Sequence, residues 1–155
     1  MRDRRERLRG MNVRFAVLLD RMQEIGKSEP WWVFVASTHR DSYEQERLYQ
    51  VGRSLIRGSD GSLRWIQTGK TVTRARPWDS AHCFGMAADI GIVDDRTSEY
   101  LPDDHPAWDV LEREALAVGL ETGNRWKFRD ANHVQIPGWK EACASEIDAL
   151  RRKYE

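Results

Sequence analysis

Two short segments of the sequence concentrate side chains that can bind a metal ion. The first segment holds His82 and Asp89, and the second holds Asp130 and His133. A catalytic zinc ion takes three protein ligands from histidine, aspartate, glutamate or cysteine, and leaves one position open for water. His82, Asp89 and His133 are therefore candidate ligands. Asp130 is a candidate base for a water molecule at the open position.

The spacing within the first segment requires a bend. His82 and Asp89 are seven positions apart, so on one straight strand their side chains would face opposite sides. Gly85 lies between them and permits the bend that could bring them together. The small Ala87 and Ala88 would let the backbone pack closely beside a metal. Taken singly, each of these residues is more often structural than catalytic.

The spacing of Ser80, His82, Gly85, Ala87 and Asp89 matches a known signature. It resembles the SxHxxGxAxD pattern of the zinc D-Ala-D-Ala carboxypeptidase and L-alanyl-D-glutamate endopeptidase family, whose members include VanY-like enzymes. Small bacteriophage endolysins that cut bacterial peptidoglycan belong to the same family.

Further segments resemble other blocks of that family in the same order. Residues 119–121, Trp126 and the pattern Asp130-x-x-His133-x-Gln135 are similar to its closing segment. Residues 37–53 resemble its "SGYRS…Q…LY…GR" block, and residues 72–76 resemble the lead-in to the first signature. The resemblance extends over about residues 33–136, which is most of the chain.

The resemblance implies a role for each matching residue. His82, Asp89 and His133 match the ligands of a Zn²⁺ cofactor. Asp130 matches the catalytic base that activates water and passes the proton to the leaving amine. Arg40 matches an arginine of the substrate site, where a guanidinium can hold a peptide carbonyl or carboxylate and stabilise the developing oxyanion.

Supporting roles are implied for three more residues. Ser80 is expected to contribute a hydrogen bond near the site, and Gln45 to support the fold or the edge of the pocket. Trp126 is expected to form part of the core or of the pocket wall. Other positions depart from the family pattern or have no assigned role; these are His39, Cys83, His105 and Thr122.

Composition limits the class of protein. The chain has 155 residues with 25 basic and 25 acidic side chains, so its net charge is zero and we expect no nucleic-acid partner. Seven tryptophans exclude a disordered chain, and two cysteines are too few for a disulfide framework. We expect one zinc peptidase catalytic domain over residues 1–155, with residues 1–10 as a basic N-terminal extension.

The hydrophobic pattern predicts an α+β fold, in which a small antiparallel sheet has flanking helices, and the resemblance implies the Hedgehog/DD-peptidase-like zinc peptidase fold. Apolar spacing and capping signals predict helices over residues 11–25, 42–51, 106–118 and 139–153. Strands are expected over residues 31–36, 87–93, 125–128 and 132–136, with a short one at 71–73. Residues 53–80 are expected to be otherwise irregular and basic. Within them, Trp65 and Trp78 either contact substrate or pack inside their own loop.

From these observations we expect a zinc-dependent peptidase that cleaves the L-Ala–D-Glu bond of the peptidoglycan stem peptide, as a phage-type endolysin does during host cell lysis. The alternatives are a D-Ala-D-Ala carboxypeptidase or dipeptidase with the same metal site, and a catalytically inactive peptidoglycan-binding zinc module. With no signal peptide and no spanning segment, we expect no stable membrane association. A monomer is expected because it is the default for a small lysin. It would be made in the cytoplasm of the host bacterium and act on the wall after release.

Overall fold

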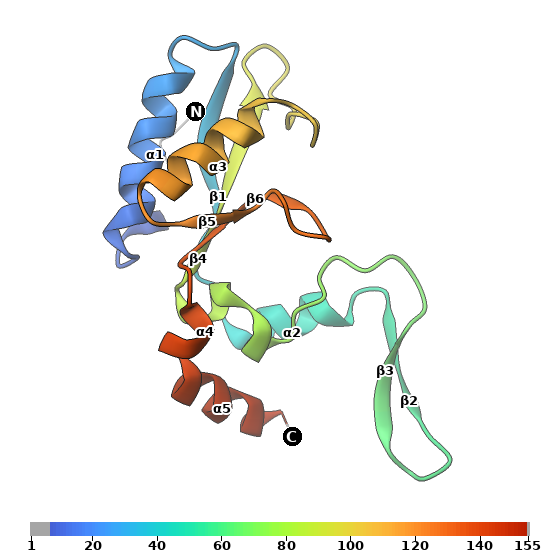
Figure 1. Ribbon diagram of the computed structural model, residues 1–155. Coiled ribbons are helices and arrows are strands. Elements are labelled where there is room, and N and C mark those ends of the chain that lie inside the picture. The colour runs from blue at the N-terminus through green and yellow to red at the C-terminus, as the bar shows by residue number, and fades with distance from the viewer. Residues whose placement is uncertain (1–6, 155) are drawn as a thin grey trace.

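The computed structural model, which describes residues 7–154, has a four-stranded sheet at its centre (Figure 1). The strands are β1 (Trp31–Ser37), β4 (Ala87–Asp94), β5 (Glu121–Gly123) and β6 (Asp130–Gln135). Their order is β1-β4-β6-β5, and each neighbouring pair is antiparallel. The expected α+β class with a small antiparallel sheet is confirmed.

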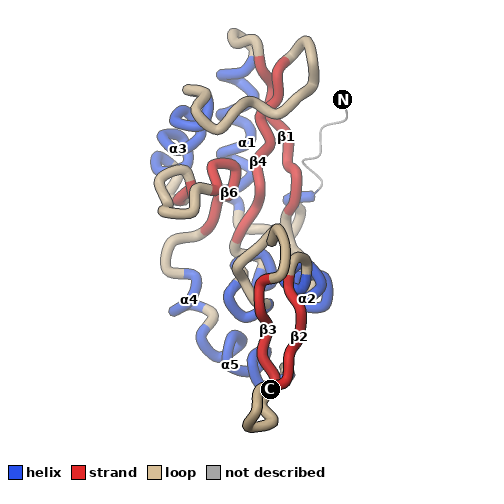
Figure 2. Tube along the Cα trace, turned by 90° about the vertical axis from the view of Figure 1, so that its right-hand side faces the viewer, coloured by secondary structure: helices blue, strands red, loops and turns tan. Residues whose placement is uncertain are grey.

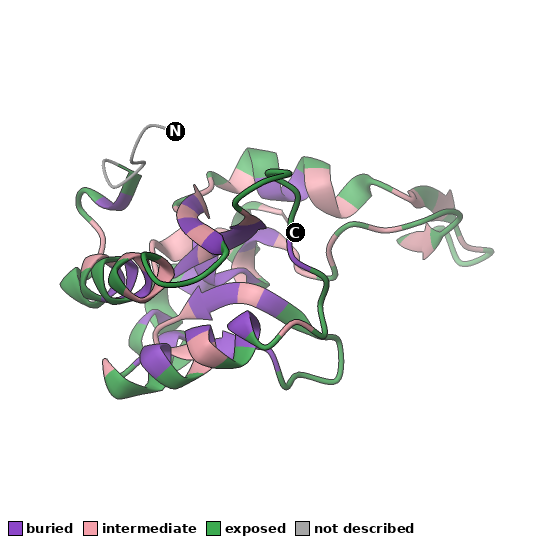
Figure 3. Ribbon diagram, turned by 90° about the horizontal axis from the view of Figure 1, so that it is seen from above, coloured by how far each residue is buried: buried purple, intermediate pink, exposed green. Residues whose placement is uncertain are grey.

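Two helices cover one face of this sheet and form the main core. They are α1 (Val13–Gly26) and α3 (Ala107–Ala117), which contact each other and the sheet (Figure 3). Alternate side chains of β1 and β4 point toward them, as the two-residue period of a strand requires. The buried residues of this core include Phe15, Leu18, Leu19, Met22, Trp31, Val33, Val35, Ile90, Ile92 and Leu111.

A second, smaller cluster lies at the end of the sheet where β4 begins (Figure 1). It is built from the 3-10 helices η2 (Pro77–Asp79) and η3 (Ala81–Phe84) and the helices α4 (Trp139–Ala142) and α5 (Ala144–Lys153). Its buried members are Ala81, Ala87, Trp139, Cys143 and Ile147. Because Ala87 belongs to this cluster and Ala88 belongs to the main core, β4 is packed on both faces.

A β-hairpin stands away from this body (Figure 1) and lies next to helix α2 (Ser42–Gln50) (Figure 2). It pairs β2 (Arg53–Arg57) with β3 (Leu63–Gln67), so the expectation of an irregular segment was wrong there. The glycine- and serine-rich residues 58–62 supply the turn between two short apolar runs. In β2 the apolar residues Leu55 and Ile56 are adjacent, and in β3 so are Trp65 and Ile66, so neither run keeps the strict alternation that predicts a strand.

Both tryptophans of this region pack against the protein's own aromatic rings. The Trp65 ring lies edge-on to Tyr49, with 6.5 Å between centroids. The Trp78 ring lies 5.8 Å from that of Tyr154 near the C-terminus. Of the two interpretations of these tryptophans, packing within the protein has direct structural support.

Three other local predictions were wrong. Residues 71–73 form no strand, and residues 125–128 form turns and bends, while β5 lies earlier, at residues 121–123. The expected final helix is split between α4 and α5 at Cys143. The split leaves Trp139 and Ile147, one from each piece, both buried in the second cluster.

Two expectations concern the ends and surface of the chain. Residues 1–6 of the basic N-terminal extension lie outside the described residues. Within residues 7–154, no helix is both long enough and apolar enough to cross a membrane.

An ion pair joins the two helices of the main core on their polar side. Arg21 of α1 donates from Nε and Nη2 to Glu114 Oε2 of α3, at 2.7 and 2.6 Å. The hydrogen bond from Arg21 lowers the pKa of Glu114 below its ordinary value, although burial of the carboxylate opposes this shift. The ionised form of Glu114 therefore stabilises the folded chain.

This ion pair predicts a pH-dependent stability. Because the folded pKa of Glu114 is depressed, its contribution is complete above the ordinary value of 4.5 and is lost as the pH falls through the folded pKa. We expect Glu114→Gln to lower the free energy of unfolding by about 1 kcal/mol at pH 7, with the difference shrinking below pH 4.5. Urea unfolding from pH 7 to pH 3 measures this.

The matched control is Glu24→Gln. Glu24 also pairs with a cation, Lys27, at 2.7 Å, but both side chains are more than two-thirds exposed. Such exposed pairs contribute little to stability. A difference for Glu114→Gln that stayed constant across this pH range would contradict the prediction.

Candidate metal centre

Three potential ligand atoms converge on one face of the sheet. His82 Nε2 lies 3.2 Å from Asp89 Oδ1, and His133 Nδ1 lies 3.3 Å from the same oxygen. The three potential ligand atoms all lie within 4.8 Å of one another. Within residues 7–154 this is the one group of three or more histidine, cysteine, aspartate or glutamate side chains arranged so closely.

Strand register brings two of these side chains together. Asp89 on β4 and His133 on β6 are direct partners across the antiparallel pair. The side chains of such cross-strand partners lie on the same face of the sheet. The pairing of β4 with β6 thus brings the first motif, residues 80–89, next to the second motif, residues 130–135.

The third side chain reaches the site through a turn. His82 lies in η3, and Gly85 ends that helix with a left-handed backbone conformation, φ 68°. Only glycine adopts this conformation without a steric cost from its side chain. The chain then enters β4, so the bend expected between His82 and Asp89 is present.

Hydrogen bonds on the far side of each imidazole set its tautomer. His82 Nδ1 lies 2.7 Å from the carbonyl oxygen of Thr38, which only accepts, so Nδ1 carries the proton and Nε2 faces Asp89 with a free lone pair. The Gln135 amide nitrogen donates to Glu121 Oε1 at 2.7 Å. Its Oε1 is therefore free to accept from His133 Nε2 at 2.8 Å, which leaves His133 Nδ1 unprotonated.

The carboxylate of Asp89 is oriented in a similar way. The Ser37 hydroxyl donates to Asp89 Oδ2 at 2.7 Å, which leaves Oδ1 facing the two imidazoles. Burial by itself would raise the pKa of Asp89, but the hydrogen bonds that His133 and His82 donate when their rings carry a second proton outweigh it and hold the pKa well below its ordinary value. Asp89 is therefore ionised, as a metal ligand must be.

The site is suited to a divalent transition metal. Two imidazole nitrogens and one carboxylate oxygen present their lone pairs to a common point. This donor set is one that catalytic zinc sites use. Metal-binding histidines also donate their second N–H to a carbonyl or carboxylate group, which fixes ring orientation. His82 and His133 both have such an outer acceptor.

A cleft of about 720 Å³ opens in front of these side chains. All three candidate ligands line it, and so do the predicted site residues Asp130, Arg40, Ser80, Gln45 and Trp126. The structure therefore brings together every residue to which the sequence assigned a role.

Arg40 is held beside the candidate ligands by its backbone and by its side chain. Its backbone N–H donates to the carbonyl oxygen of His82 at 3.1 Å. Its Nη1 donates to Gln45 Oε1 at 2.7 Å, and the Gln45 amide nitrogen donates to the carbonyl of Ala75 at 2.8 Å. Gln45, only 1% exposed, thus orients the guanidinium at the cleft.

Asp130 begins β6 and lines the cleft. The walls of the cleft displace water from its carboxylate and raise its pKa, and the negative charge of Asp89 adds to this rise, while His133 and His82 oppose it. Gly123, its cross-strand partner, permits this approach, because a Cβ there would lie 2.5 Å from the Asp130 carbonyl oxygen.

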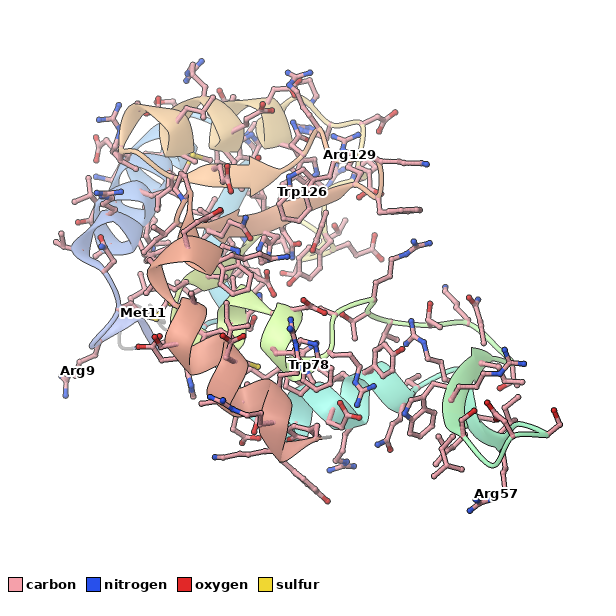
Figure 4. All side chains as sticks on the ribbon, turned by 60° about the horizontal axis from the view of Figure 1, so that its bottom comes forward. Arg9, Met11, Arg57, Trp78, Trp126 and Arg129 are labelled. Atoms are coloured by element: carbon pink, nitrogen blue, oxygen red, sulfur yellow. The ribbon has the colours of Figure 1, made fainter. Side chains whose placement is uncertain are left out.

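Trp126 and Ser80 both line the cleft, as expected for residues that support the site. The Trp126 ring is 5.3 Å from that of His133 between centroids, and the residue is 41% exposed (Figure 4). Ser80 is buried immediately before η3. The Trp126 ring thus borders the candidate ligands directly.

Three residues that departed from the family pattern or lacked a role lie outside the ligand group. His39 is exposed and does not line the cleft. Cys83 does not join the candidate ligands, and burial raises the pKa of its thiol to about 11. His105 accepts a hydrogen bond through Nδ1 from the backbone of Ala107 at 3.0 Å, at the start of α3.

Four groups around the site were missed by reasoning from the sequence. They are the Ser37 hydroxyl, the Thr38 carbonyl, the Gln135 amide and the Glu121 carboxylate. All four lie in segments that carry the family resemblance. The motifs identify the segments that form the site, but which side chains of these segments contact one another depends on the fold.

Solved structures that share this fold include two peptidases. The L-Ala D-Glu endopeptidase ChiX of Serratia marcescens is 20% identical, with 88% of this chain and 87% of that chain covered and a TM-score of 0.51. The vancomycin resistance D,D-pentapeptidase VanY, in a complex with Zn(II), is 15% identical, with 89% and 78% covered and a TM-score of 0.51. No protein-family model and no curated protein sequence matches the chain. The expected DD-peptidase-like fold is confirmed.

The outer hydrogen bond to His133 predicts a change in metal affinity. Gln135→Leu removes the acceptor that fixes the tautomer of His133, so we expect Co²⁺ affinity to fall about 10- to 100-fold. Absorption titration with Co²⁺ measures this, with Gln67→Leu on the exposed strand β3 as the matched control. Equal affinities for both variants would contradict the assigned tautomer.

The turn at Gly85 predicts a second effect on metal binding. Gly85→Ala and Gly61→Ala both force alanine into a left-handed conformation, φ 68° and 83°, with no atom within 4 Å of the new Cβ. Each costs about 1 kcal/mol locally. Only Gly85 lies between His82 and Asp89, so we expect only Gly85→Ala to weaken Co²⁺ binding. Weaker binding by Gly61→Ala, at the hairpin tip, would show that the effect is not local.

Proposed function

We propose that this chain is a zinc-dependent peptidase of the bacterial cell wall, a member of the family that its sequence resembles. The observation that carries the proposal is the convergence of His82, Asp89 and His133 in one cleft with Asp130 and Arg40. Both structures that share its fold are peptidases by name, and VanY is complexed with Zn(II).

His82 Nε2, Asp89 Oδ1 and His133 Nδ1 would hold the ion. A zinc ion bound there supplies a Lewis acid that polarises a carbonyl and makes water acidic enough to react near neutral pH. The protein would contribute by fixing the tautomer and the ring orientation of the two histidine ligands. The contacts with Thr38 and Gln135 support this role.

Asp130 acts as the general base and then as the general acid. Its carboxylate accepts a proton from the attacking water and later gives it to the nitrogen of the leaving amine. The raised pKa of Asp130, caused by displacement of water around it, suits a group that must both take up and release a proton. Asp130 lines the same cleft as the three candidate ligands, which supports its role in proton transfer.

Arg40 holds the oxygen of the scissile carbonyl as negative charge develops on it. Gln45 binds one guanidinium nitrogen of Arg40, so the cation is preoriented before substrate arrives. A donor that is already in place costs no reorganisation at the moment of reaction.

The proposed substrate is the peptidoglycan stem peptide, cut at the L-Ala–D-Glu bond. The activity in the name of ChiX supports this bond. The role in phage-mediated host lysis rests on the sequence resemblance. The name of VanY supports the alternative of a D-Ala-D-Ala peptidase. A catalytically inactive binding module is disfavoured because Asp130 accompanies all three candidate ligands.

A digest of purified peptidoglycan tests the reaction and the bond. We expect zinc-loaded protein to release new L-Ala carboxyl and D-Glu amino termini, identified by mass spectrometry, and a chelator to abolish this release. Release of D-Ala alone would identify the alternative peptidase. No cleavage by folded, zinc-loaded protein would identify a binding module.

The role of Asp130 predicts a separable effect. Asp130→Asn removes the proton acceptor while leaving the three candidate ligands, so we expect kcat to fall about 10²- to 10⁴-fold with zinc content unchanged. Asp148→Asn, the same chemical change on the exposed surface of α5, is the matched control. Full activity of Asp130→Asn would refute the assignment of the base.

A further inference from the structure

We infer that Arg129 recognises a carboxylate on the substrate residue whose amine is released. The inference rests on the proposed function and adds a specificity-determining residue to it. Arg129 immediately precedes Asp130 and lines the same cleft. Figure 4 shows Arg129 and Trp126 close together, across from Trp78.

The Arg129 guanidinium is anchored along one edge. Its Nε and Nη2 both donate to Asn124 Oδ1, at 3.0 and 2.7 Å. The Nη1 group and the second proton of Nη2 remain, and together they form the outer edge of the guanidinium. Two parallel N–H groups on one edge match the two oxygens of a carboxylate.

Asn124 is itself fixed by helix α3. The residue is 6% exposed, and its Nδ2 donates to Asp109 Oδ1 at 2.9 Å and to Glu112 Oε2 at 2.7 Å. Both amide protons are used, so the amide cannot flip and its oxygen must face Arg129. A partly buried network, with Asn124 at its centre, thus sets the direction of an exposed cation.

The charge of Arg129 is not neutralised by the protein. Within residues 7–154 the structure gives it no carboxylate partner. Arg125, on the same loop, differs, because it pairs with Glu112 at 2.9 Å and faces α3. Arg125 is therefore paired with α3, whereas Arg129 presents an edge of its guanidinium at the cleft with its charge not neutralised.

The chemistry of the substrate places a carboxylate beside the leaving nitrogen. In the stem peptide D-Glu continues the chain through its γ-carboxyl, so its α-carboxylate is free and shares a carbon with the nitrogen that leaves. In D-Ala-D-Ala the terminal carboxylate has the same position. In the proposed reaction Asp130 delivers a proton to the leaving nitrogen of the substrate. Arg129, the neighbour of Asp130 in the chain, lines the same cleft and is therefore placed to bind the substrate carboxylate beside that nitrogen.

Pairs of peptides that differ only in this carboxylate test the inference. One pair is N-acetyl-L-Ala-γ-D-Glu-L-Lys and its isoglutamine counterpart; the other is N-acetyl-D-Ala-D-Ala and its C-terminal amide. We expect Arg129→Gln to lower kcat/KM for the acid of the cleaved pair about 10- to 100-fold, mainly through KM, and to leave the amide unchanged. Arg129→Lys should retain part of the preference. The pair that shows the effect identifies the source of the carboxylate.

Arg125→Gln is the matched control, because it removes an equal charge from the same loop without facing the cleft. The dissociation constants of the same peptides, measured by calorimetry, give a second readout that does not require turnover. A wild-type preference for an acid over its amide that disappears in Arg129→Gln and persists in Arg125→Gln supports the inference.

Two outcomes separate this inference from the proposed function. If the wild-type protein binds an acid in preference to its amide through Arg129 but cleaves neither, the inference holds and the proposed function fails. If the wild-type protein cleaves or binds acid and amide equally, or if Arg129→Gln keeps the preference, the inference is overturned while the proposed function is judged by the digest.

Discussion

The pairing of β4 with β6 is the constraint on which the site depends. The register that places Asp89 opposite His133 puts a carboxylate and an imidazole side by side. The register of β1 against β4 places Ser37 opposite Asp89, and the serine hydroxyl binds the second carboxylate oxygen. A slip of one residue in either pair would turn a side chain to the other face of the sheet. The sheet thus sets the candidate ligand geometry.

Packing on both faces of β4 keeps that register in place. Ala88 is buried in the main core with α1 and α3, and its neighbour Ala87 is buried in the cluster formed by η3, α4 and α5. A strand that is packed on both sides cannot shift without opening two clusters, so its position is strongly specified. The buried carboxylate of Asp89 relies on this rigidity, because its compensation depends on hydrogen bonds with fixed partners.

The sequence predicted what local spacing determines. The periodicity of residues 11–25 and the apolar run at 31–36 predicted α1 and β1, and the two motifs that resemble the peptidase family gave His82 with Asp89 and His133 as candidate ligands. The hairpin was missed because adjacent apolar residues in each of its strands break the alternation. Residues 125–128 were mistaken for a strand, although Asn124 holds this loop against α3 through contacts that only the fold creates. For the same reason, neither the Thr38 contact nor the setting of Arg129 was foreseen.

The arginines differ in the partner that binds the guanidinium. Some bind a carboxylate and stabilise the fold, and others bind an amide oxygen and remain available to a ligand. Arg40 and Arg129 each bind a neutral amide oxygen, from Gln45 and Asn124, which fixes direction without cancelling charge. Three other arginines bind carboxylates and link elements of the fold; they are Arg21, Arg76 and Arg125, with Glu114, Glu46 and Glu112. A carboxylate partner in the cleft would compete with an anionic substrate, whereas an amide does not. Arg40 and Arg129, two of the three arginines that line the cleft, are thus oriented by the protein but left charged, which suits the proposed acidic peptide.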